Sequence, residues 1–111
     1  MEVTKTQLKR CDLVTVKGRV DGSTAPKLDQ ALKDITNAQR YRIVIDLGEV
    51  DYISSAGLRV IISAQKTCRR WNRGDVRLAN LSERVSEVFN LAGLKPLFNI
   101  YESTVEAVGS F

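Results

Sequence analysis

The sequence predicts an α/β fold, with a mostly parallel central sheet of about five strands flanked by about four helices. Apolar and β-branched segments alternate along the chain with segments whose apolar residues recur every three or four positions, as strands alternate with helices. Residues 43–47 are largely apolar, which is typical of a parallel strand buried on both faces. The 111 residues, 43% of them hydrophobic, suffice for one domain over residues 1–111.

Two strands are expected at the start of the chain. Residues 3–8 alternate weakly between apolar and polar, and residues 13–16 with Val20 are apolar or β-branched. A short turn near residues 9–12 would join them. The first strand would then pair antiparallel with the second, at an edge of the sheet.

A helix and the central strand should follow. Residues 18–26 are rich in turn-forming types; Thr24 is a plausible N-cap, and Pro26 fits a first helical turn. The helix after Pro26 is predicted from apolar residues at helical spacing, namely Leu28, Ala31, Leu32 and Ile35. The central strand that follows is expected to end at Leu47, before a short loop.

The second half of the chain should continue the alternation of helices and strands. Its expected elements are a helix at 56–71, a break at 72–75, a strand at 76–79, a helix spanning Val85 to Leu91 and ended by Gly93, a strand at 98–101, and a terminal helix at 103–108 capped by Ser103.

The composition excludes several classes of function. The sequence contains no histidine, so it cannot build a Ser-His-Asp or Cys-His site. Cys11 and Cys68 are far apart and lack metal-ligand spacing, so we expect reduced thiols and no metal or other cofactor. No apolar stretch is long enough to cross a membrane, and the start lacks the apolar core of a signal peptide. We therefore expect a cytoplasmic protein that is not an enzyme and does not bind membranes.

The net charge of +4 has two interpretations. Nucleic acid could be the partner, but the lysines and arginines are interleaved with acidic residues and form no run of five or six like charges. We therefore expect no nucleic acid and favour an acidic protein surface as the partner.

The most informative segment lies between the central strand and the next helix. Ser54 and Ser55 stand at the helix start, beyond the carboxyl end of a buried strand, where sites of open α/β sheets lie. Free N–H groups there suit a phosphate. Either serine could instead simply cap the helix. A nucleophile elbow is disfavoured, because Ile53 replaces the first elbow glycine and no histidine could activate the serine.

Residues 46–59 resemble the signature of STAS domains, in particular of bacterial anti-sigma factor antagonists. Residues 18–28 and 76–94 resemble two further segments of that family, in the same order, so the resemblance covers nearly the whole chain. It implies a single STAS domain in which Ser55, two positions before Gly57, is phosphorylated. The usual motif has an acidic residue before this serine and a serine after it, where this chain has Ser54 and Ala56.

The resemblance also implies a partner-binding surface around Ser55. Asp21 matches an acidic loop residue near the serine, although it could equally be a plain turn aspartate. In the helix after the serines, an apolar side should face the sheet, and a second side, Arg59, Ser63, Lys66, Arg70 and Arg73, forms a basic stripe or a merely solvated face. Trp71 should pack in the core or at an edge. The expected partner-binding residues are Asp21, Ser54, Ser55, Ala56, Gly57, Arg59, Ser63 and Lys66.

By the same resemblance, the unphosphorylated chain would bind an anti-sigma factor serine kinase with a histidine-kinase-like ATPase fold, thereby releasing a sigma factor. A metal-dependent serine phosphatase would reset the switch, and the chain itself would be a monomer or a weak dimer. Two other functions stay open. One is a STAS-type signalling scaffold that is not phosphorylated, and the other is a sensor of a small ligand or nucleotide.

Overall fold

The computed structural model describes residues 1–71 and 74–111. Residues 72 and 73, which belong to the predicted break, lie outside the described residues. In chain order the elements are β1 (Glu2–Gln7), β2 (Asp12–Val20), α1 (Ala25–Asn37), β3 (Arg42–Ile53), α2 (Ser55–Arg69), β4 (Asp75–Ala79), α3 (Glu83–Leu91), the 3-10 turn η1 (Lys95–Leu97), β5 (Asn99–Tyr101) and α4 (Thr104–Gly109). Apart from η1, this is the predicted order.

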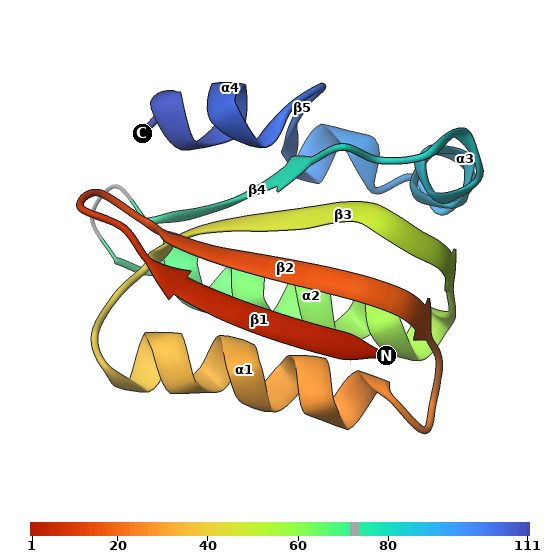
Figure 1. Ribbon diagram of the computed structural model, residues 1–111, viewed down its shortest axis with the longest axis horizontal. Coiled ribbons are helices and arrows are strands. Elements are labelled where there is room, and N and C mark those ends of the chain that lie inside the picture. Colours follow the sequence, from red (N-terminus) through yellow and green to blue (C-terminus); the bar gives the residue numbers. More distant parts are fainter. Residues whose placement is uncertain (72–73) are drawn as a thin grey trace.

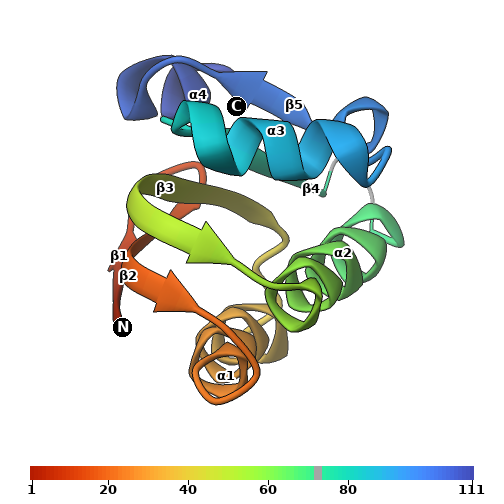
Figure 2. The same cartoon turned by 90° about the vertical axis from the view of Figure 1, so that its right-hand side faces the viewer.

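The strands form one sheet in the order β1-β2-β3-β4-β5. β1 pairs antiparallel with β2, and each later pair is parallel, as predicted. In Figures 1 and 2, α1 and α2 lie together on one side of β3, and α3 and α4 lie on the other. The α/β fold class is therefore confirmed.

The apolar run at the start of β3 is explained by burial on both faces of the sheet. Ile43 and Ile45 belong to a large core cluster with residues of α1 and α2, whereas Val44 belongs to a smaller cluster with Ala107 of α4. All three side chains of the run are 0% exposed. Alternation of successive side chains between two buried faces requires an apolar residue at every position.

The prediction that the central strand ends at Leu47 is wrong, because β3 continues to Ile53. The extension pairs with the second half of β2, up to the pair formed by Val20 and Ile53. Two register shifts interrupt this pairing, and the first lies opposite Leu47 and Gly48. The predicted turn from Gly18 is also wrong at its start, because Gly18, with φ of 96°, lies inside β2.

Candidate functional site

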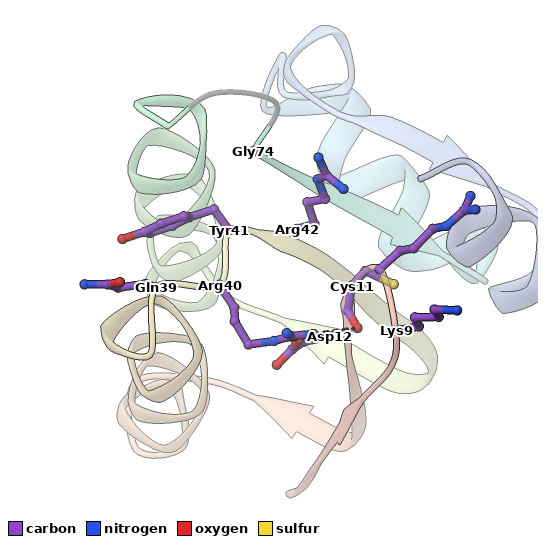
Figure 3. A pocket seen from close by; sticks show the side chains of 9 residues that line it. Lys9, Cys11, Asp12, Gln39, Arg40, Tyr41, Arg42 and Gly74 are labelled. Carbon is purple, nitrogen blue, oxygen red and sulfur yellow. Dashed lines mark hydrogen bonds and ion pairs between the residues drawn. The ribbon is translucent and has the colours of Figure 1, made fainter.

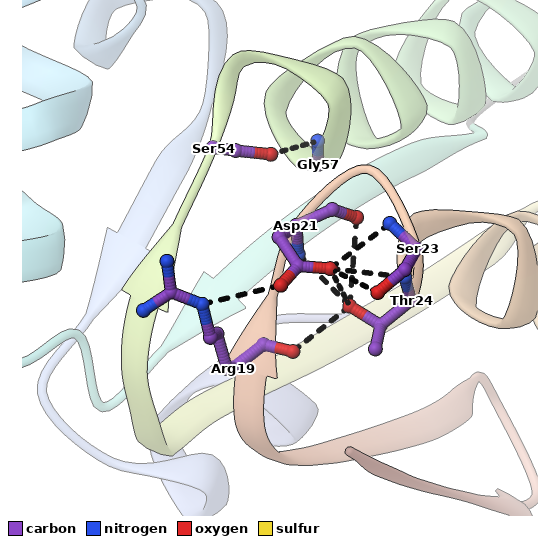
Figure 4. Close-up of polar contacts among 6 residues, drawn as sticks. All are labelled: Arg19, Asp21, Ser23, Thr24, Ser54 and Gly57. Atoms are coloured by element: carbon purple, nitrogen blue, oxygen red, sulfur yellow. Dashed lines mark hydrogen bonds and ion pairs between the residues drawn. The ribbon is translucent and has the colours of Figure 1, made fainter.

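The two serines lie where the ends of β2 and β3 meet. The backbone N–H of Ser54 donates to the carbonyl oxygen of Val20 at 2.8 Å, which fixes the last residue of β2 beside the start of α2. Each strand then turns into a helix, β2 through the Asp21 loop into α1 and β3 directly into α2 (Figure 4). The carboxyl ends of two parallel strands thus present two adjacent helix starts.

Ser54 and Ser55 play different structural roles. Ser54 is the N-cap of α2: its backbone is extended, and its Oγ accepts a hydrogen bond from the Gly57 N–H at 3.4 Å. Ser55 is the first residue of the helix and is exposed. Its hydroxyl contacts Arg59 one turn later, where Nη2 donates to Oγ at 3.5 Å. The capping alternative therefore applies to Ser54.

Gly57 allows α2 to start close against both strands. A Cβ at this position would lie 2.7 Å from Cγ1 of Val20 and 2.9 Å from Cγ1 of Ile53. Both neighbours are buried β-branched side chains with few rotamers available. The role of Gly57 is therefore close packing inside the domain.

Asp21 organises the loop between β2 and α1 (Figure 4). Its Oδ1 accepts from the Ser23 hydroxyl at 2.7 Å, from the Ser23 N–H at 2.9 Å and from the Thr24 N–H at 3.2 Å. These contacts, led by the Ser23 hydroxyl, lower the pKa of Asp21 from 3.8 to about 2. The carboxylate thus shapes the turn and also pairs with Arg19.

Thr24 is the N-cap residue of α1, as predicted, but its side chain makes no capping hydrogen bond. Its hydroxyl donates instead to the carbonyl oxygen of Arg19 at 2.9 Å and accepts from the Asp21 N–H at 2.8 Å. Asp21 satisfies one of the free donors at this end, because its carbonyl oxygen accepts from the Ala25 N–H at 2.7 Å.

Arg19 and Tyr52 form a part of this surface that the sequence did not reveal. The two residues are opposite each other in β2 and β3. The guanidinium carbon of Arg19 lies 4.0 Å from the centre of the Tyr52 ring, and its Nε donates to Asp21 at 3.1 Å. Tyr52 is 38% exposed, so an aromatic side chain lies beside Ser54 and Ser55.

The two sides of α2 are arranged as predicted. Leu58, Ile61, Gln65 and Cys68 are buried, and Ile62 packs against the core. Trp71, just beyond the helix, is half exposed and stacks on Tyr41 with ring centres 5.0 Å apart, as expected for edge packing. The exposed side carries Arg59, Ser63, Lys66 and Arg70; the predicted stripe residue Arg73 lies outside the described residues.

Among residues 1–71 and 74–111, no three histidine, cysteine or carboxylate side chains are grouped as a metal site would require. The described helices are all too short or too polar to span a bilayer.

Several known proteins resemble this chain in sequence over most of its length. The STAS domain profile matches residues 2–107. BtrV of Bordetella bronchiseptica, named as a candidate anti-sigma factor antagonist, is 32% identical over 111 residues, which cover 100% of this chain and 95% of BtrV. An anti-sigma-B factor antagonist of Listeria monocytogenes is 34% identical over 87 residues, which cover 78% of this chain and 75% of that protein.

Solved structures share the fold. A candidate anti-sigma factor antagonist of Thermotoga maritima superposes with a TM-score of 0.90 at 21% identity, over 97% of this chain and 92% of that one. The Bacillus cell fate determinant SpoIIAA in its phosphorylated form superposes with a TM-score of 0.77 at 15% identity, over 98% of each chain. Together with the matches in sequence, these likenesses show that the chain belongs to the STAS domain family, among relatives named as anti-sigma factor antagonists.

Proposed function

We propose that this chain is an anti-sigma factor antagonist, a non-enzymatic switch whose binding to an anti-sigma factor is controlled by phosphorylation of Ser55. The observation that carries the proposal is the different use of the two serines. The Ser54 hydroxyl caps α2, whereas the Ser55 hydroxyl is exposed and a kinase can modify it without removing the cap.

The position of Ser55 explains how the fold tolerates a phosphate. The first turn of a helix presents free N–H groups and the positive end of the helix dipole, which favour a negative charge. Phosphorylation adds a charge of roughly −1.5 to −2. That charge would be felt mainly by a protein that packs on the start of α2.

Arg59 gives the switch a second component. Its guanidinium already reaches the Ser55 hydroxyl, so a phosphate on Ser55 would attract it more strongly. An arginine held by the phosphate would be withdrawn from acidic groups of the partner. Phosphorylation would thus add a repulsive charge and remove an attractive one.

The proposed partner-binding surface follows the exposed side of α2 away from Ser55. It includes Ser55, Ala56, Arg59, Ser63 and Lys66. Asp21, Ser54 and Gly57 would support this surface by shaping the two helix starts, and Arg19 and Tyr52 would extend it across the strand ends.

In the proposed cycle the unphosphorylated chain, one domain over residues 1–111, binds the anti-sigma factor and a sigma factor is released. The anti-sigma factor is also the kinase, with a histidine-kinase-like ATPase fold, and ATP with its magnesium belongs to that partner. A metal-dependent serine phosphatase restores the binding form.

The proposal is tested by incubating the chain with ATP and the ATPase-fold serine kinases of its own genome, then mapping phosphate by mass spectrometry. The expected result is modification of Ser55 that is lost in Ser55→Ala and retained in Ser54→Ala. An unmodified chain with every kinase would contradict the switch and favour a scaffold.

A further inference from the structure

A pocket of about 340 Å3 lies at the end of the sheet where β2 and β3 begin, opposite the end that carries Ser55. It is formed where the turn between β1 and β2 meets the connection from α1 to β3 (Figure 3). β2 and β3 are parallel, so their first residues lie here and their last residues lie beside Ser54 and Ser55. The nine residues of β2 separate the two ends by roughly 26 Å.

The pocket is lined mainly by positive charge. Lys9, Arg10, Arg40 and Arg42 contribute cationic side chains, and Asp12 contributes the carboxylate. In Figure 3, Arg40 reaches toward Asp12, Lys9 and Arg42 lie on the side of Cys11, and Tyr41 and Gln39 point the other way. Four cationic residues thus line one pocket.

One of these cations is already neutralised within the fold. Arg40 forms an ion pair with Asp12, which is buried, and donates from Nη2 to the carbonyl oxygen of Leu8 at 2.9 Å. These contacts hold the β1–β2 turn against the start of β3. They also neutralise the carboxylate of Asp12, so it does not balance the other cations.

Among the described residues, Lys9, Arg10 and Arg42 take part in no ion pair or side-chain hydrogen bond. Like charges that face one pocket repel one another, and they attract anions from solution. Arg42 also borders a second hollow, of about 520 Å3, so the donor group is reachable from two sides.

We propose that this pocket binds a small phosphate compound carrying two or more negative charges. Guanidinium groups donate pairs of hydrogen bonds that match phosphate oxygens, and a lysine adds a compact point charge. The volume lies in the range of small-ligand sites. The site is separate from Ser55, and the proposal does not rest on the function proposed above.

Isothermal titration of the full chain with inorganic pyrophosphate at low ionic strength tests this proposal. The expected result is saturable binding with a Kd below about 1 mM, and a Kd raised about tenfold by Arg42→Gln and by Arg10→Gln. Arg10 lies on an exposed turn, so its substitution keeps the test valid if Arg42→Gln fails to fold. Binding should also weaken as salt is raised.

Arg84→Gln is the matched control, because Arg84 is exposed on α3 and borders a different hollow beside Gly48. It should leave binding unchanged.

Amide shifts in 15N spectra should be confined to residues 9–12 and 39–42. A parallel titration with ADP identifies the source of the phosphate: tighter binding than pyrophosphate indicates a nucleotide, and equal or weaker binding indicates a free oxyanion. Absence of saturable binding, an equal loss in Arg84→Gln, or shifts centred on Ser55 would overturn the proposal.

Discussion

Ser54 and Ser55 are chemically identical neighbours, and the fold uses their hydroxyls differently. The Ser54 oxygen accepts from the Gly57 N–H, one of the donors that a helix start leaves free. Ser55 has turned into the helix, where its hydroxyl faces outward toward Arg59. A substitution at each position therefore separates structural loss from loss of a modifiable group.

Ser54→Ala should lower the free energy of unfolding by about 1 kcal/mol, because it removes the N-cap of α2. Ser55→Ala should change it by less than about 0.5 kcal/mol, because the hydroxyl is exposed. Urea denaturation of both variants measures the difference. Equal losses would show that Ser55 is as structural as Ser54.

The pKa of Asp21 reports on the neighbouring loop. Hydrogen bonds led by the Ser23 hydroxyl lower this pKa from 3.8 to about 2. Because the folded pKa lies below the unfolded one, the stability that this carboxylate contributes is complete above about pH 4. It is lost as the pH falls toward 2.

Ser23→Ala should raise the pKa of Asp21 toward 3.8, as measured by carbon-13 NMR titration of the carboxyl group. The internal control is Asp34, whose pKa is lowered by Lys5 and Gln30 on a different surface. Its titration should not change. An unaltered Asp21 midpoint in the variant would show that the hydroxyl does not stabilise the carboxylate.

At the scale of elements, the positions of Ser54 and Ser55 depend on how closely α2 approaches β2 and β3. Val20 and Ile53 end β2 and β3 side by side, and Gly57 lies against both. The N–H of Ser54 then joins the second strand to the helix start. The position of Ser55 is thus set by packing between three elements.

Gly57→Ala should destabilise the chain by about 1–2 kcal/mol, because overpacking against Val20 and Ile53 outweighs the better helix propensity of alanine. Gly109→Ala in α4 is the control, since a Cβ there meets nothing within 4 Å. Thermal unfolding followed by circular dichroism compares them. A Gly57→Ala variant as stable as Gly109→Ala would contradict the close contact.

Much of this arrangement could be predicted from the sequence, because periodicity identifies elements that are buried on one or both faces. The apolar and exposed sides of α2 were predicted correctly for this reason. The second half of β3 was not, because Glu49, Asp51 and Tyr52 are exposed and only Val50 and Ile53 reach the core. A strand with so few buried positions has the composition of a loop.

The contact between Arg19 and Tyr52 could not be predicted either. It depends on the register of β2 against β3, and two irregularities alter that register before the residues meet. The side chain of Thr24 posed a similar problem. Its sequence position suits a cap, but the competing partners of its hydroxyl, the Arg19 carbonyl oxygen and the Asp21 N–H, become visible only once the loop is folded.

At the scale of the whole molecule, the core contains a polar side chain of α2 whose hydrogen bonds are made inside the protein. Gln65 is buried, and its amide bridges the backbone of Val76 and the carbonyl oxygen of Leu97. Cys11 and Cys68 are also buried, in different core clusters. Burial, with a smaller effect from Asp75, raises the pKa of Cys68 to about 12.

Neither thiol should therefore react with an aromatic disulfide reagent at pH 8 while the protein is folded. A thiol with a raised pKa carries almost no thiolate, and both sulfur atoms are shielded. In denaturant both should react at once. The absorbance of the released thiolate measures this, and rapid modification of the native chain would show that the core opens readily.

The whole molecule also separates its charged surfaces. The basic pocket lies at the first residues of β2 and β3, and the proposed phosphorylation site lies at their last residues. Binding of a protein partner at the start of α2 should therefore be independent of anion binding in the basic pocket. The proposed switch depends only on the chemistry at the start of α2.

The most direct test is the affinity of the chain for its anti-sigma factor with serine or phosphoserine at position 55. Isothermal titration should show tight binding of the unmodified chain and binding weakened about a hundredfold, or about 2.7 kcal/mol, by the phosphate. Ser55→Ala, the control for loss of the hydroxyl, should bind about as tightly as the unmodified chain. Equal affinities with and without the phosphate would contradict a switch at Ser55.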